Sequence, residues 1–119
     1  MMMYNYREIS TDSVEFVTVA KLEDVDEGER LFVEIDDHEL VVFNIAGEYF
    51  AIGDVCSHDD GPLGDGEIED HEIICPRHGA RFDVRSGQVT ALPAVTDIPA
   101  YPVRISGNDI EIGIPLDEE

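Results

Sequence analysis

Two cysteines and two histidines stand in pairs along this chain. Cys56 is followed two positions later by His58, and Cys75 is followed three positions later by His78. With four histidines in 119 residues, both neighbours arise by chance on the order of once in a thousand. Thiolate and imidazole are the ligands that suit zinc and iron–sulfur clusters. The two pairs therefore predict a metal centre with two sulfur and two nitrogen ligands.

Two kinds of metal centre compete for this ligand set. A structural zinc site usually presents C-x₂₋₄-C together with H-x₃₋₅-H, so that like ligands come from one knuckle. Here each segment contains one cysteine and one histidine instead. That arrangement suits a binuclear centre with two thiolates on one iron and two imidazoles on the other, which is the ligand set of a Rieske [2Fe–2S] centre.

The segment between residues 56 and 79 resembles the Rieske box, C-x-H…C-P-x-H-G, in both its ligands and its intervening length. The resemblance implies a Rieske-type [2Fe–2S] cluster as cofactor. Cys56 and Cys75 would hold the buried iron, and His58 and His78 would hold the outer iron. The similarity extends over most of the chain, but its specificity lies in residues 56–83.

Further residues take roles by the same resemblance. Gly79 would let the loop backbone approach the cluster sulfurs and donate N–H groups to them. Leu63 is expected to shield the cluster from water because of its place in the glycine-rich run 61–66, apart from the resemblance. Pro93 lies in a segment that resembles the family's proline loop, which covers the cluster. The stretch 98–104 resembles the return strand that closes the domain.

The chain departs from the high-potential branch of the family at positions that are cysteine, serine or tyrosine in that branch. That branch has an extra cysteine pair, whose positions here are Asp60 or its neighbours and Arg77, so no disulfide is expected between the two ligand loops. The serine and tyrosine whose hydroxyls donate to sulfur are replaced by Ala80 and Phe82. Fewer donors near the sulfurs stabilise the reduced cluster less, so a low potential is expected.

The low-potential branch resembles the ferredoxin that relays single electrons from a reductase to the terminal oxygenase of a ring-hydroxylating system. The chain has no glycine motif for flavin or nicotinamide and no room for a catalytic domain. We therefore expect an electron-transfer component rather than an enzyme. A small Rieske-like subunit of a nitrite reductase and a zinc-stabilised interaction module without redox activity are the alternatives.

The loops that contain the Cys–His pairs are positioned by short strands, which alternate with turn residues along the chain. This pattern predicts an all-β antiparallel sandwich or barrel with a small cluster-binding subdomain. A single domain is expected over residues 1–119, with the subdomain at about 55–83 and a flexible acidic tail at 117–119. Weak helical character is confined to 22–29. The predicted strands cover residues 16–20, 31–35, 39–43, 49–52, 67–69, 72–74, 81–84, 88–90, 103–105 and 109–112.

Other polar residues receive more ordinary interpretations. His38 and His71 lie in predicted turns and are expected to be solvated there. Asp59 and Asp60 are expected to form a solvated loop rather than a cation site. Arg77, next to a predicted ligand, would either contact a partner or neutralise nearby acid. The glycine-rich run 61–66 has no lysine and no following helix, so a phosphate cradle is not expected.

The charge balance restricts the partners. The chain has 7 basic and 28 acidic residues, for a formal net charge of −21, and Lys21 is its one lysine. Such a polyanion is repelled by nucleic acid and by anionic membranes, so neither is expected as a partner. No secretory signal is recognisable, which favours a cytoplasmic location. An acid excess this large with so little lysine also suggests a salt-loving source organism, because concentrated salt screens the repulsion.

Overall fold

Eleven β-strands and one short 3₁₀-helix make up residues 14–115, the part of the chain that the computed structural model describes. The all-β prediction is confirmed. The elements are β1 (Val14–Lys21), η2 (Leu22–Asp24), β2 (Arg30–Ile35), β3 (His38–Ile45), β4 (Glu48–Gly53), β5 (Glu67–Glu69), β6 (Glu72–Ile74), β7 (Arg81–Asp83), β8 (Val89–Ala91), β9 (Ala100–Tyr101), β10 (Val103–Ser106) and β11 (Asp109–Pro115).

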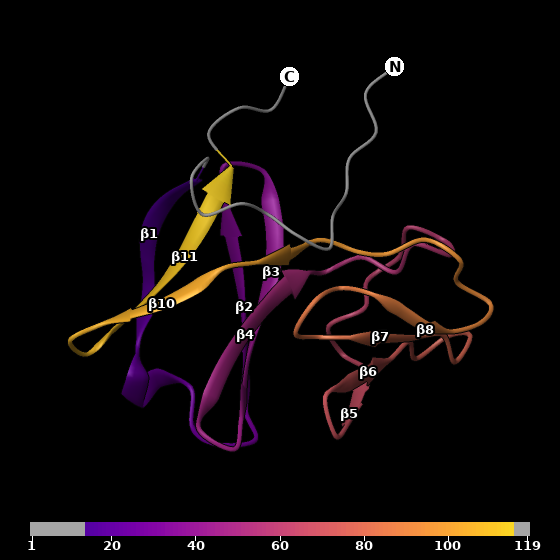
Figure 1. The fold of residues 1–119 in the computed structure, drawn as a ribbon, viewed down its shortest axis with the longest axis horizontal. Helices are drawn as coiled ribbons and strands as arrows, with labels where there is room; N and C mark the ends of the chain where they lie inside the picture. Colours follow the sequence, from indigo (N-terminus) through magenta and orange to yellow (C-terminus); the bar gives the residue numbers. More distant parts are fainter. Residues whose placement is uncertain (1–13, 116–119) are drawn as a thin grey trace.

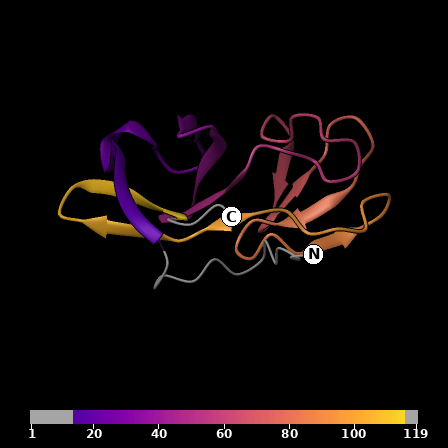
Figure 2. The same cartoon turned by 90° about the horizontal axis from the view of Figure 1, so that it is seen from above.

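The strands form three antiparallel sheets (Figure 1). The first has the order β1-β11-β10, the second β2-β3-β4-β9 and the third β5-β6-β7-β8. Figure 2 shows the first two sheets together on one side of the molecule and the third sheet on the other. The second sheet is therefore the middle sheet of the molecule. It connects the β-sandwich, which it forms with the first sheet, to a second lobe, which contains the third sheet.

Strand β3 is buried on both faces, which explains its uninterrupted apolar run. Leu40 and Val42 pack with Ile112 of β11 in the core of the sandwich. Val41 and Phe43 point to the opposite face and pack in a second core, which is shared with the third sheet. Because successive strand residues point to opposite faces, a strand between two cores needs apolar residues at every position.

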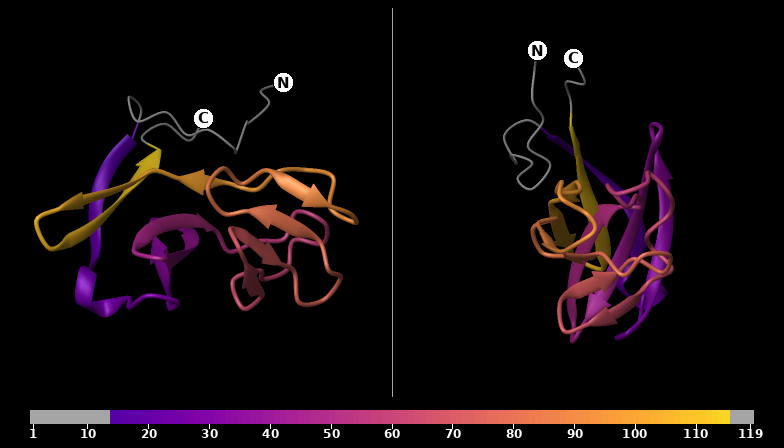
Figure 3. Two further views of the ribbon diagram at one scale, coloured as in Figure 1. Left: turned by 60° about the horizontal axis from the view of Figure 1, so that its bottom comes forward. Right: turned by 90° about the vertical axis from the view of Figure 1, so that its right-hand side faces the viewer.

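The third sheet is inserted between two strands that pair with each other. The chain leaves the middle sheet at the end of β4 and returns to it at β9, where Ala51 pairs with Tyr101 and Ile52 with Ala100. Figure 3 shows the inserted lobe beside the sandwich. The range 55–83 that the sequence indicates for the subdomain covers β5 to β7, and the same sheet continues with β8.

Tight turns match the predicted hairpins, with small differences. Asp36 and Asp37 both have positive φ (48° and 72°), as a two-residue type I′ turn between β2 and β3 requires. His38 was expected in this turn but is the first residue of β3. The helical stretch expected at 22–29 is limited to η2. Strand β9 was not distinguished from β10: Pro102 separates them, and they belong to different sheets.

Within residues 14–115, no helix is long and apolar enough to cross a membrane. The acidic tail expected at 117–119 lies outside the described residues.

Candidate metal centre

Three loops of the inserted lobe carry the predicted site residues. Residues 54–66 connect β4 to β5 and contain Cys56 and His58, and residues 75–80 connect β6 to β7 and contain Cys75 and His78. Residues 92–99 lead from β8 to β9. Each Cys–His pair thus follows a strand, as the sequence predicts.

The two cysteine loops have the same backbone hydrogen bonds. The N–H of Cys56 donates to the carbonyl of Gly61 (2.8 Å), and the N–H of Cys75 donates to that of Ala80 (2.7 Å), in each case five residues ahead. The Cys56 carbonyl accepts from the N–H of Asp60 (2.7 Å), and the Cys75 carbonyl accepts from that of Gly79 (3.0 Å). Asp60 and Gly79 both have positive φ. The loops are therefore two copies of one turn.

This repeat gives Gly79 a different role from the one expected. Its N–H was expected to donate to a cluster sulfur, but it donates to the Cys75 carbonyl and closes the turn. With φ of 79°, Gly79 adopts a conformation that favours glycine. Its counterpart in the first loop is Asp60, and aspartate is one of the few residue types that tolerate positive φ.

The two thiols are deeply buried and close to each other. Cys56 and Cys75 are free cysteines with 0% and 1% exposure, and they belong to the core that joins the middle sheet to the inserted lobe. Burial raises the pKa of the Cys56 thiol, and the neighbouring Cys75 thiol raises it further. The raised pKa favours the neutral thiol, and a bound metal ion would stabilise the thiolate form instead.

The two imidazoles lie at the surface, beside each other. The ring centroids of His58 and His78 are 4.8 Å apart and their planes meet at 78°. Both residues are exposed. Among the described residues no three His, Cys, Asp or Glu side chains gather as one metal site. The donors are arranged instead as a buried sulfur pair and an exposed nitrogen pair, which is what a centre of two irons requires.

Leu63 packs in the same core as the two cysteines. Its exposure is 0%, and its loop is held by charged residues from other parts of the chain. The carboxylate of Asp54 accepts from the N–H groups of Leu63 (2.9 Å) and Gly64 (2.6 Å). Arg30, on β2, donates to the carbonyl oxygens of Gly64 and Gly66. The shielding position expected for Leu63 therefore depends on Asp54 and Arg30.

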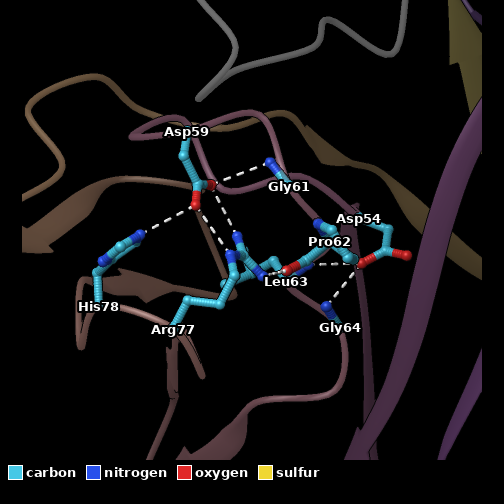
Figure 4. Close-up of polar contacts among 8 residues, drawn as sticks. All are labelled: Asp54, Asp59, Gly61, Pro62, Leu63, Gly64, Arg77 and His78. Carbon is cyan, nitrogen blue, oxygen red and sulfur yellow. Dashed lines mark hydrogen bonds and ion pairs between the residues drawn. The ribbon is translucent and has the colours of Figure 1, made fainter.

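Asp59, in the first cysteine loop, contacts two residues of the second (Figure 4). Its carboxylate accepts two hydrogen bonds from the guanidinium of Arg77, and its Oδ2 lies 3.2 Å from Nε2 of His78. The Arg77 hydrogen bonds hold the pKa of the Asp59 carboxyl well below its usual range. Of the two roles considered for Arg77, the structure shows neutralisation of nearby acid. Asp59 is paired, not merely solvated.

The remaining predicted site residues lie near the thiols, with one exception. Ala80 and Phe82 are fully buried in the core that contains both cysteines. Pro93 is exposed, and it is the next residue, Ala94, that packs in this core. The proline loop is tied to the first cysteine loop by the Ser57 hydroxyl, which donates to the Thr96 carbonyl.

The two other histidines have partners of their own. His38 Nδ1 is 3.2 Å from the hydroxyl of Tyr101, so it is not a solvated turn residue. The ring of His71 contacts Phe50 edge to face, with centroids 5.7 Å apart.

Asp54, Arg30 and the pairing of Asp59 were not anticipated from sequence. Arg30 is 34 residues from Gly64, and Asp59 is 18 residues from Arg77. The one signal in the sequence was the scarcity of basic residues, because 28 acidic residues compete for only 7 basic ones. Every described basic side chain has a partner in the structure: Lys21, Arg30, Arg77, Arg81, Arg85 and Arg104.

Comparisons with known proteins point to one family. Residues 15–102 match the family model of the Rieske [2Fe-2S] domain. The 3-phenylpropionate/cinnamic acid dioxygenase ferredoxin subunit of Escherichia coli (strain K12) is 39% identical over 93 residues, which cover 77% of this chain and 87% of that protein. The ferredoxin of carbazole 1,9a-dioxygenase from Nocardioides aromaticivorans IC177 superposes with a TM-score of 0.77 at 36% identity, over 82% of this chain and 95% of that one.

A structure described as an NADH-dependent nitrite reductase small subunit from Mycobacterium tuberculosis also superposes, with a TM-score of 0.75. It is 20% identical and covers 85% of this chain and 96% of that one, a likeness that shows the fold alone. The resemblance inferred from the Cys–His pairs is confirmed.

Proposed function

Because this chain belongs to the Rieske [2Fe–2S] domain family, we propose that it is the ferredoxin of a ring-hydroxylating dioxygenase system. It accepts single electrons from a reductase and passes them to a terminal oxygenase. The proposal is supported by the similarity to a dioxygenase ferredoxin subunit over nearly the whole of that protein. The observation that carries it is the pair of buried thiols beside a pair of exposed imidazoles.

Four residues of this chain fit the cluster as ligands. Cys56 and Cys75 would hold the inner iron, and His58 and His78 the outer iron. The buried sulfur pair suits the side of the cluster that is shielded from water, and the exposed imidazoles suit the side that a partner protein approaches. When bound, the cluster supplies reversible one-electron chemistry.

The chain itself determines how an electron reaches a partner. Leu63, Ala80 and Phe82 exclude water from the sulfur side, since all three have 0% exposure. The edges of the two histidine rings are the route to the surface. With no hydroxyl at positions 80 and 82, we place the potential at the low end of the Rieske range of roughly −150 to +300 mV.

The acid excess bears on partners and environment. A charge of −21 favours reductase and oxygenase surfaces that are basic, with association that slows as salt rises. The same charge supports a salt-rich environment, in which self-repulsion is screened. We place the protein in the cytoplasm, because a cysteine pair in an intracellular protein is more often metal-binding than disulfide-bonded.

The first experiment is an absorption spectrum of protein purified in molar KCl, followed by low-temperature EPR after reduction with dithionite. A red-brown protein with a Rieske-type signal supports the proposal. A colourless protein with one zinc and no iron would contradict electron transfer and favour the zinc-stabilised interaction module. Reduction by a flavin reductase and oxidation by an oxygenase then test the partners. Co-purification with a sirohaem protein instead of an oxygenase would favour the nitrite reductase subunit.

A further inference from the structure

One arginine joins the two ligand loops, which have no covalent link. Arg77 lies between Cys75 and His78 in the second loop, and its guanidinium reaches into the first. Nε donates to Oδ2 of Asp59 (2.8 Å), and Nη2 donates to Oδ1 (2.7 Å). The third nitrogen, Nη1, donates to the Pro62 carbonyl. All three guanidinium nitrogens are therefore used on residues of the other loop.

The backbone of the first loop is shaped to receive this guanidinium. A Cβ added to Gly61 would lie 2.7 Å from Nη2 and 2.8 Å from Cζ of Arg77. The guanidinium thus packs directly against the Gly61 backbone. The Gly61 N–H in turn donates to the Asp59 carboxylate (3.0 Å), which orients the acceptor toward Arg77.

Asp59 also faces a predicted ligand. Its Oδ2 is 3.2 Å from Nε2 of His78, so one carboxylate contacts both Arg77 and the imidazole (Figure 4). With Nε2 directed at Asp59, Nδ1 is the nitrogen left to coordinate iron. Hydrogen bonds from the second nitrogen of a ligating histidine orient its ring and raise its basicity.

We propose that Asp59 and Arg77 are positioning residues that clamp the two ligand loops together and orient the His78 ring for the outer iron. This inference rests on the proposed cluster site. The bidentate geometry makes the pair stronger than an ordinary surface ion pair, and its side chains are only 28% and 33% exposed. The outer side of the site needs such a link because His58, His78 and Gly79 are exposed and make little contact with the core.

A second bidentate pair in the same lobe provides a matched control. Arg85 donates to both carboxylate oxygens of Asp83 (3.0 and 2.8 Å), but the two residues belong to one turn between β7 and β8. Replacing either pair removes the same two charges and one bidentate arginine–carboxylate contact. Only the Asp59–Arg77 pair connects the loops that contain the predicted ligands.

The test measures the rate at which the holoprotein loses its visible absorbance in excess chelator, at constant ionic strength. Arg77→Gln and Asp59→Asn are each expected to bleach about tenfold faster than wild type, as loss of a charge-assisted pair implies. Their double variant should bleach no faster than either alone, because both changes break one clamp. Arg77→Lys retains the charge without the two-pronged geometry and should fall between. Arg85→Gln should match wild type.

A redox measurement separates orientation of His78 from general stability. Asp59→Asn removes the carboxylate charge next to Nε2 of His78 and should raise the midpoint potential, whereas Asp83→Asn should leave it unchanged. Should Arg77→Gln retain no cluster, Arg77→Lys is compared with Arg85→Lys in the same assay.

The clamp is overturned if the Asp59 and Arg77 variants bleach at the rate of their controls, or if the double variant is additive. If Asp59→Asn and Asp83→Asn have the same midpoint potential, Asp59 has no role in orienting His78. Failure of the proposed function is a separate result, because wild-type protein would then lack the iron–sulfur absorbance before any variant is compared.

Discussion

The carboxylate of Asp54 accepts a hydrogen bond from the backbone N–H of Leu63 at 2.9 Å. Asp54 directly follows β4, and Leu63 begins the return of the chain toward β5. The same oxygen accepts from the N–H of Gly64. One side chain thereby sets how far the apolar Leu63 reaches into the core that contains Cys56 and Cys75.

Asp54→Ala should loosen this loop. Two backbone N–H groups lose their acceptor, so the free energy of unfolding should fall by about 2 kcal/mol, and the cluster should be lost faster as water reaches the sulfur side. Urea denaturation and chelator bleaching measure the two effects. Asp65→Ala, an exposed carboxylate in the same loop, is the control and should change stability by less than about 0.5 kcal/mol. Equal effects of the two substitutions would contradict the role of Asp54.

Gly87→Ala should prevent closure of the β7–β8 hairpin against the proline loop. A Cβ at Gly87 would lie 2.0 Å from the carbonyl oxygen of Ile98, and φ is 79°. Because the obstacle is backbone, the loss should reach about 3 kcal/mol or more. Gly107→Ala is the control, since it also has positive φ (63°) but open space around it. It should cost about 1 kcal/mol, and thermal melting of both variants tests the difference.

Ala80→Ser should raise the midpoint potential of the cluster. Ala80 is buried beside Cys75, so a hydroxyl there can donate to sulfur and stabilise the reduced state. Ala51→Ser, in the core of the sandwich away from the thiols, is the buried control and should leave the potential unchanged. Protein-film voltammetry compares the two. A second hydroxyl from Phe82→Tyr should raise the potential further.

His78→Cys should move the potential in the opposite direction. Thiolate in place of imidazole puts negative charge on the outer iron, so the potential should fall by on the order of 100 mV or more. EPR of the reduced protein first establishes that a cluster assembles. A rise in potential would contradict the assignment of His78 as a ligand.

Acid should weaken the Asp83–Arg85 pair. The Arg85 hydrogen bond lowers the pKa of Asp83 in the folded protein, so the pair's contribution to stability is complete above the unfolded pKa of about 3.9. It is lost as the pH falls through the lower folded value. The difference in urea midpoint between wild type and Asp83→Asn should therefore shrink from pH 7 to about pH 3. Asp65→Asn controls for relief of general charge repulsion, and a difference that grows on acidification would refute the assignment.

Molar KCl should raise the melting temperature by roughly 5 °C or more relative to dilute buffer. The basic side chains of residues 14–115 are already paired, and they are far outnumbered by carboxylates, so most carboxylates in that range have no arginine or lysine partner and repel one another. Differential scanning calorimetry at several KCl concentrations measures the effect. An unchanged melting temperature would remove the argument for a salt-rich environment.

The sequence by itself was sufficient for the all-β class, nearly every hairpin and the Cys–His pairs. These features depend on local information: alternation in the strands, turn residues such as Asp36 and Asp37, and ligand spacing within a few residues. The apolar run of β3 was also visible, but the sequence did not reveal that it lies between two cores. The division of the return segment at Pro102 was likewise missed, because it depends on which sheet each half joins.

Only the tertiary structure decided what holds the site together. Asp59 and Arg77 are 18 residues apart and Arg30 and Gly64 are 34 apart, and no local pattern marks such partners. Among the acidic residues of the described range 14–115, the few that pair with an arginine are selected by how the folded chain brings them together. The types and spacing of the ligands are written in short segments, whereas their support comes from long-range contacts that exist only after the chain has folded.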